Sequence, residues 1–171
     1  MNAKSLMLLV GLHTVAMAAA ASSLFAEDRP ANAGPAAAFD ATADMALKAM
    51  KSRADELHVS GVAVVAYAQG DSVSSWSSKM QVVGGMTQAP SAKDKGANLL
   101  GIAYAKAAEM AATLRDSGSG VRPPLTGEFG WQGGVVAKGR TGILIAAFSG
   151  GRSEDDVSIS KAGLGVLTRA L

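Results

Sequence analysis

Val62-Ala63-Val64-Val65-Ala66-Tyr67 is a continuous apolar run of strand length, and the prediction of the fold starts from it. The tripeptide that follows, Gln69-Gly70-Asp71, is typical of a hairpin turn. The next segment, 73–83, alternates between two kinds of side chain, with Trp76, Met80 and Val82 on one side and Ser75, Ser77, Lys79 and Gln81 on the other. This alternation predicts a partner strand with one buried face and one solvated face.

A second hairpin is expected near the C-terminal end of the chain. Segments 134–137 and 142–148 are both apolar and of strand length, and Gly139-Arg140 lies between them at the predicted turn. The segment 84–96, which carries Gly84-Gly85 and Pro90, is expected to be a loop. Two pairs of consecutive strands favour antiparallel pairing.

Three helices flank and separate these hairpins. Apolar residues recur at helical spacing over 40–57, 98–116 and 153–171. Asp40 and Ser153 are the expected N-caps of the first and last helix. The order α-β-β-α-β-β-α predicts an α+β fold, in which helices pack on an antiparallel sheet.

The first 26 residues have the organisation of a cleavable signal peptide. Lys4 precedes an uncharged run from Leu6 to Ala21, which is shorter than the roughly 20 apolar residues of a membrane span. Cleavage is expected after Ala26 or, nearly as well, after Ala21; an uncleaved membrane anchor is the alternative. A flexible tether over 27–39 and one domain over 40–171 follow. We therefore expect an exported protein, periplasmic or secreted, with no membrane span after cleavage.

The composition excludes several classes of function. The chain has 16 basic and 14 acidic side chains, without a basic cluster, which argues against a nucleic-acid partner. It has no cysteine, which excludes disulfides, thiolate metal sites and the attachment motif of c-type haem.

A resemblance to a known family rests on several fragments in fixed order. They are Val62-Ala63-Val64-Val65 with Gly70, Ala105-Lys106-Ala107-Ala108, Gly133-Gly134-Val135-Val136, and 142–146 with Ser149-Gly150-Gly151, Asp155-Asp156 and Ala162-Gly163. With them, the segment from Asp40 to Leu171 resembles the GlcG/HbpS family of haem-binding domains, which recurs at the C-terminus of PduO-type cobalamin adenosyltransferases.

The resemblance implies a profilin-like fold with a five-stranded antiparallel sheet, haem or a corrinoid as ligand, and assembly into homo-oligomers. The fifth strand is expected within 125–131. One departure concerns the acid that the family usually has in the pattern V-V-D-x-x-G. Ala66-Tyr67-Ala68-Gln69-Gly70 offers no acid here, so the role of that Asp is not carried over.

Candidate ligand-binding residues are few. An iron ligand must be a His, Met, Tyr or hydroxyl because cysteine is absent, and the thioethers considered are those of Met80 and Met86. His58 is the only histidine outside the leader and the candidate nitrogen ligand; a structural role at a helix end is its alternative. Tyr67 and Tyr104 are candidate phenolate ligands, or else packing residues. Lys106 is a candidate partner for a haem propionate, or else a solvated lysine whose stem lies along the apolar stripe.

The glycine pair before the last helix resembles an anion-binding arrangement. Gly150-Gly151 precedes Ser153, but Glu154, Asp155 and Asp156 fill the first turn. Their charge would repel a phosphate, so we expect these acids to satisfy the helix N-terminus themselves.

Catalytic motifs are missing from the sequence. It contains no H-E-x-x-H, G-x-S-x-G, Walker A or dinucleotide-binding fingerprint. The expected function is therefore an exported haem- or tetrapyrrole-binding module that is not an enzyme, acting in sequestration, transport or sensing. A ligand-free structural or oligomerisation domain of the same fold is the alternative, and an enzyme of tetrapyrrole metabolism is the weakest hypothesis.

Overall fold

The first helix begins earlier than the sequence suggested. The computed structural model describes residues 34–171, so the expected signal peptide and residues 27–33 of the expected tether lie outside the described residues. Helix α1 spans Pro35–Glu56, which places residues 35–39 in a helix instead of the expected tether. Asp40 is therefore an interior residue and not the N-cap. Pro35 suits the first helical position. Phe39 is fully buried in the core, so the longer helix is stabilised by the burial of this ring.

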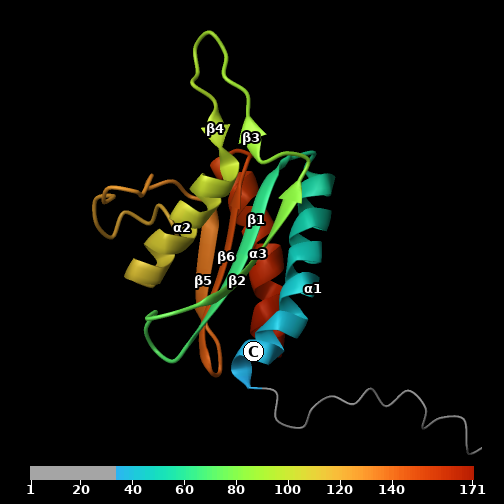
Figure 1. Ribbon diagram of the computed structural model, residues 1–171, viewed down its shortest axis with the longest axis vertical. Helices are drawn as coiled ribbons and strands as arrows, with labels where there is room; N and C mark the ends of the chain where they lie inside the picture. Colours follow the sequence, from blue (N-terminus) through green and yellow to red (C-terminus); the bar gives the residue numbers. More distant parts are fainter. Residues whose placement is uncertain (1–33) are drawn as a thin grey trace, which may run out of the picture. The chain divides into compact units, whose positions relative to one another are not determined.

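A four-stranded antiparallel sheet forms the centre of the fold. Its spatial order is β2 (Ser77–Val83), β1 (Gly61–Gln69), β6 (Gly142–Ser149) and β5 (Gly134–Lys138). The other helices are α2 (Leu99–Thr113) and α3 (Ser153–Ala170). The α+β class is thus confirmed, and the order α-β-β-α-β-β-α holds for the three helices and the four strands of this sheet (Figure 1).

The expected fifth strand over 125–131 is wrong. No strand forms there, and the extra strands are β3 (Thr87–Gln88) and β4 (Ala97–Asn98). They make a separate two-stranded hairpin, with β3 inside the expected loop 84–96 and β4 directly after it. Gly127 and Gly130 have φ values of 96° and 64°, which lie outside the strand region. The segment 125–131 therefore turns where a strand would have to extend.

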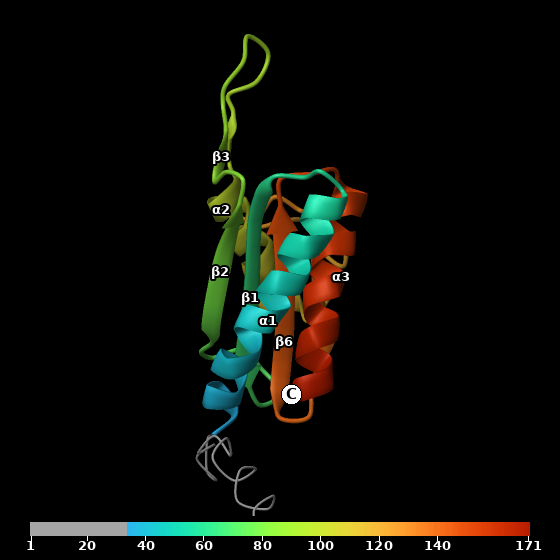
Figure 2. The same ribbon diagram turned by 90° about the vertical axis from the view of Figure 1, so that its right-hand side faces the viewer.

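Helices cover both faces of the sheet. Figures 1 and 2 show α1 and α3 on one face and α2 on the other. Along β1, Ala63 and Val65 belong to the core beneath α1 and α3, whereas Val62 and Val64 pack on the side of α2. The central strands β1 and β6 are thus buried on both faces, which explains their unbroken apolar sequence. No helix within residues 34–171 is long and apolar enough to cross a membrane.

Strand β2 lies at one edge of the sheet and differs from its prediction. It begins at Ser77 and not at residue 73, and its expected solvated face is half-buried. Lys79 on that face donates to the carbonyl oxygen of Asp40 at 3.0 Å and to Oδ1 of Asp44 at 3.2 Å, so α1 covers it. On the other face Met80 packs beside the core under α2, while Val82 is 38% exposed.

The connector from α2 to β5, residues 114–133, is ordered by its own polar contacts. Arg122 donates through both terminal nitrogens to the Glu128 carboxylate, at 2.6 and 2.7 Å, and the N–H of Leu125 donates to the same carboxylate at 2.9 Å. These donors lower the pKa of Glu128 to about 2. The ring centroids of Phe129 and Trp131, in the same connector, are 4.8 Å apart.

Candidate functional site

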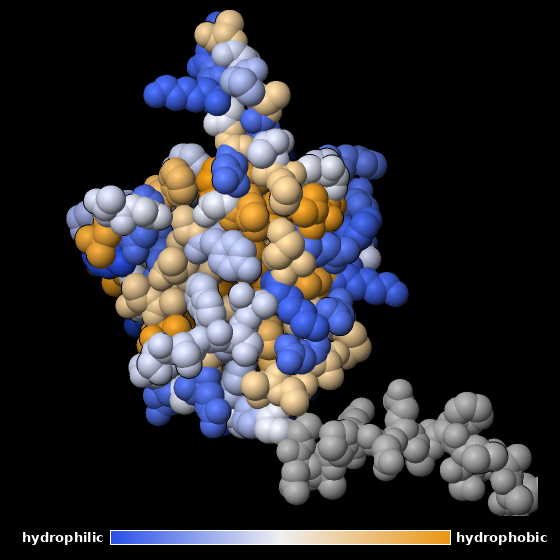
Figure 3. Space-filling view, in the orientation of Figure 1, coloured by the Kyte–Doolittle hydropathy of each residue, from blue (hydrophilic) through white to orange (hydrophobic). Residues whose placement is uncertain are grey.

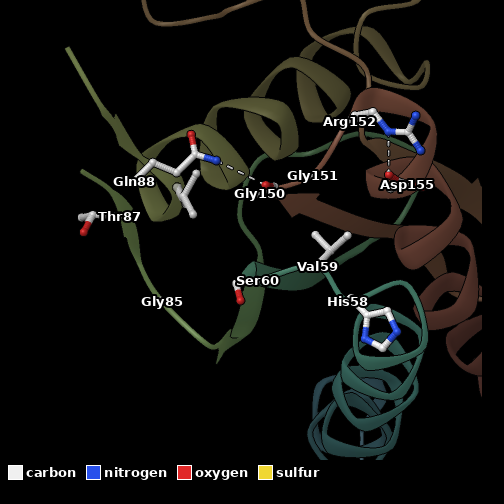
Figure 4. Close-up of a pocket in the computed structure, with 11 residues that line it drawn as sticks. His58, Val59, Ser60, Gly85, Thr87, Gln88, Gly150, Gly151, Arg152 and Asp155 are labelled. Atoms are coloured by element: carbon white, nitrogen blue, oxygen red, sulfur yellow. Dashed lines mark hydrogen bonds and ion pairs between the residues drawn. The ribbon is translucent and has the colours of Figure 1, made fainter. Parts of the chain in front are cut away.

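An open pocket of about 570 Å³ lies at one end of the sheet, and we call it the end pocket. It is formed where several elements begin or end: the end of α1, the start of β1, the β2–β3 turn, the start of α2 and the β6–α3 loop. Figure 4 shows its lining, which consists of His58, Val59, Ser60, Gly85, Thr87, Gln88, Leu99, Gly150, Gly151, Arg152 and Asp155. Its volume is in the range of pockets for small organic ligands, roughly 300–1,000 Å³.

The backbone after α1 directs His58 to the rim of this pocket. Leu57 caps the helix, and His58 follows in the left-handed conformation with φ of 55°. Its N–H donates to the carbonyl oxygen of Asp55 at 3.1 Å, and the N–H of Val59 donates to that of Ala54 at 2.9 Å. This arrangement ends the helix and leaves the imidazole exposed. These bonds are made by the backbone, so the helix end uses the left-handed turn at His58, and the imidazole itself lies at the pocket.

Gly150 allows the two sides of the pocket floor to meet. Its φ is 154°, and a Cβ at this position would collide with the carbonyl oxygen of Ser60. The absence of a side chain lets the β6–α3 loop lie directly against the start of β1. Gln88 reaches the same loop, because its amide nitrogen donates to the carbonyl oxygen of Gly150 at 3.3 Å (Figure 4).

A buried ion pair lies beneath this loop. Nζ of Lys106 donates to Oδ2 of Asp156 and to the carbonyl oxygen of Phe148, each at 2.8 Å, and both charged side chains are 3% exposed. The other carboxylate oxygen of Asp156 accepts the N–H of Gly151 at 2.8 Å. Burial raises the pKa of Asp156, and the nearby Lys106 ammonium opposes this shift. The pair ties α2, β6 and α3 together and holds Gly151 in the pocket floor.

The expectation of a solvated Lys106 is wrong, and its ammonium is engaged inside the protein. A lysine with Asp156 and a backbone carbonyl as partners cannot also reach a ligand carboxylate at the surface. The cation that lines the pocket is instead Arg152, whose side chain in its ion pairs is 77% exposed. It contacts Asp155 at 3.2 Å and Glu154 at 3.4 Å. The pair with Glu154 is exposed and therefore weak. The Asp155 side chain is only 19% exposed and also lines the pocket, so a ligand anion would compete with this carboxylate for the guanidinium.

The tyrosines do not line the end pocket. Tyr67 is 3% exposed, stacks on Phe39 and donates its hydroxyl to Thr141, so it is a core residue. Tyr104 is half-buried, with its hydroxyl 3.4 Å from Oγ of Ser78. Of the candidates His58, Tyr67, Tyr104 and Lys106, the structure brings only His58 to the pocket.

Arg152 was not among the expected site residues, and α3 begins differently from the expectation. Arg152 is the N-cap and makes no side-chain capping bond, so Ser153 is not the cap. The acids of the first turn are present as expected. Asp156, however, accepts from Gly151 before the helix and not from the first turn itself. The sequence did carry a signal for this site. Two glycines directly before a helix indicate that another part of the backbone lies close to the helix start, and Arg152 is the next residue.

Two further observations bear on the identity of the site. Within residues 34–171, no group of three or more His, Asp or Glu side chains could hold a metal ion. The chain matches no protein-family model, and a comparison with curated proteins finds no match.

Proposed function

We propose that this domain binds haem or a related tetrapyrrole in the end pocket, with His58 as the iron ligand. The observation that supports the proposal best is the exposed imidazole of His58 at the rim of a pocket of suitable volume. His58 is also the only histidine among residues 34–171. The similarity to the GlcG/HbpS family, carried by short ordered fragments, points to the same ligand class.

The lining matches the chemistry of a tetrapyrrole. A single nitrogen ligand suffices for the iron, so a cluster of ligating side chains is not required. Val59 and Leu99 offer apolar contact to the ring, and Arg152 offers a guanidinium to a propionate carboxylate. Ser60 and Thr87 add hydroxyl groups at the pocket wall. A corrinoid would use His58 and the same apolar contacts, but its amide side chains would accept hydrogen bonds from Arg152 in place of a carboxylate.

We also propose that the domain acts by binding and not by catalysis, and that it does so after export to the periplasm or the medium. The first part rests on the absence of catalytic motifs from the sequence, and the second on the organisation of residues 1–26. A ligand-free structural domain remains the second candidate, and the open edge of β2 described below favours it.

The test is a titration of the purified protein with haemin, followed by absorbance. The proposed function predicts a Soret band at micromolar haemin, and His58→Asn should weaken affinity by about tenfold or more, which is ~1.4 kcal/mol. Asn is the preferred replacement because it tolerates the left-handed conformation of His58, where Ala would add strain.

Tyr104→Phe is the matched control, since Tyr104 lies outside the pocket and its variant should bind like the unmodified protein. Circular dichroism establishes that both variants keep the fold. An unchanged spectrum and affinity in His58→Asn would overturn the assignment of His58, and no Soret band at all would favour the ligand-free alternative.

A further inference from the structure

The two edges of the sheet are treated differently within residues 34–171. At the β5 edge, the outward N–H of Val136 donates to Oδ1 of Asp116 at 2.9 Å, and that of Gly134 donates to Oγ of Ser117 at 2.8 Å. The N–H of Ser117 in turn donates to the carbonyl oxygen of Gly134. The connector therefore closes this edge to another strand.

The β2 edge has no such cover from the described part of the chain. The N–H of Phe148 donates to Gly133 beside β5, and the N–H of Gly70 donates to Thr141 beside β6. Because backbone groups alternate in direction along a strand, the even-numbered residues of β1 point to β6 and the odd-numbered residues point to β2. In the register of β1 with β2, odd-numbered residues of β2 therefore point to β1. The residues whose N–H and C=O point away from the sheet are Ser78, Met80 and Val82.

Natural edge strands are often protected by a charge, a proline or a bulge, and β2 has none of these in its outer row. Its only charged residue, Lys79, is turned back onto α1 through Asp40 and Asp44. Val82 remains 38% exposed and Met86, just beyond the strand, 47%. Figure 2 shows β2 at the outer margin of the sheet, and Figure 3 shows apolar residues gathered below the base of the β3–β4 hairpin.

We propose that β2 pairs with β2 of a second copy of this chain, antiparallel and about a two-fold axis at Met80. Met80 is the middle residue of Ser77–Val83, so this register pairs the strand over its full length. It places Met80 opposite Met80 of the second copy, and Ser78 opposite Val82. All of these residues have outward N–H and C=O groups, so each pair can exchange hydrogen bonds in both directions.

The outward row Ser78, Met80 and Val82 is symmetric about Met80, which suits a second copy as the occupant, and charge disfavours a neighbouring register. With the axis at Met80, Lys79 of one copy lies opposite Gln81 of the other. A shift of the axis to Lys79 would bring two lysines directly opposite each other, which is destabilising. The strand is therefore complementary to itself in one full-length register, as a two-fold interface requires. The four-stranded sheets of both copies then become continuous.

Cysteine scanning tests the register directly because the chain contains no cysteine. Met80→Cys should form an intermolecular disulfide rapidly under mild oxidation, since Cα atoms in such a pair are about 5.5 Å apart, within disulfide range. Ser78→Cys and Val82→Cys are the matched controls. In the proposed dimer, the two Ser78 residues are about 13 Å apart along the strand, and so are the two Val82 residues. Each single variant should therefore cross-link slowly, whereas a mixture of the two variants should cross-link rapidly, because Ser78 lies opposite Val82 of the second copy.

Sedimentation velocity from about 1 to 100 µM tests the assembly itself. The unmodified protein should be dimeric in this range, and Val82→Pro should be monomeric because it removes one outward N–H while leaving the bonds to β1. Val82→Ala keeps that N–H and should remain a dimer. Three results would overturn the proposal. They are an unmodified protein that is monomeric throughout the range, a folded Val82→Pro variant that is still a dimer, and a Met80→Cys variant that cross-links no faster than Val82→Cys. Haemin binding is measured separately, so either proposal can fail while the other stands.

Discussion

Replacing Lys106 with Met is expected to destabilise the domain strongly. Lys106 and Asp156 are each 3% exposed, and Met keeps the length of the lysine stem while removing its charge. The Asp156 carboxylate would then lie in the interior with only neutral backbone N–H donors, those of Gly151 and Gly150, and the carbonyl oxygen of Phe148 would lose the ammonium. Breaking a buried ion pair on one side leaves an uncompensated charge, which is the costly outcome.

The expected loss is about 3–5 kcal/mol in the free energy of unfolding. A whole domain has roughly 5–15 kcal/mol, so the variant should stay folded only with a narrow margin. With about 2–4 °C per kcal/mol, the melting temperature should fall by on the order of 10 °C. Lys106→Met/Asp156→Asn should recover most of this loss, because Asn is neutral and still accepts from Gly151.

The effect also has a defined dependence on pH. Burial raises the pKa of Asp156 in the folded state, and removing Lys106 takes away the charge that opposes this rise. Between the unfolded value of about 3.9 and the raised folded value, the folded state binds more protons, so stability falls as pH rises. The deficit of Lys106→Met should therefore be larger at pH 8 than at pH 5.

Urea unfolding at both pH values, followed by circular dichroism, measures these differences. Lys161→Met is the matched control, because Lys161 is exposed on α3 and its loss should stay within about 0.5 kcal/mol. A Lys106→Met protein as stable as the original at pH 8, or a deficit that does not change with pH, would refute the reasoning.

Two other outcomes are expected. Glu128 has its pKa lowered from 4.5 to about 2 in the fold, so its contribution to the order of the connector is complete above pH 4.5 and is lost as pH falls toward 2. In a Trp76→Phe background, Trp131 fluorescence should report that transition, and Glu128→Gln should abolish it; the same titration in the variant would contradict this. Extracytoplasmic protein should lack at least its first 21 residues, and an intact mass that includes Met1 or Asn2 would disprove cleavage.

Much of the fold was predictable because its signals are local. The apolar runs 62–67 and 142–148 and the helical spacing between them specify strands and helices through the periods of their own backbones. The pairing of each run with its neighbour in the sequence, 73–83 and 134–137, predicted the antiparallel α+β class. The start of α1 at Pro35 was missed, because it depends on the burial of Phe39 under other elements. The expected strand over 125–131 failed because Glu128 is bound to Arg122 in a closed connector.

For the site, the sequence by itself determined that His58 is the only histidine besides His13 and that no cysteine can bind a ligand. Only the tertiary structure decided that Lys106 is internal, because its partner Asp156 is 50 residues away along the chain. It likewise placed Arg152 beside His58 in one pocket. These residues lie on separate elements that are brought together by packing across the sheet. Local sequence periodicity contains no information about which elements meet in this way.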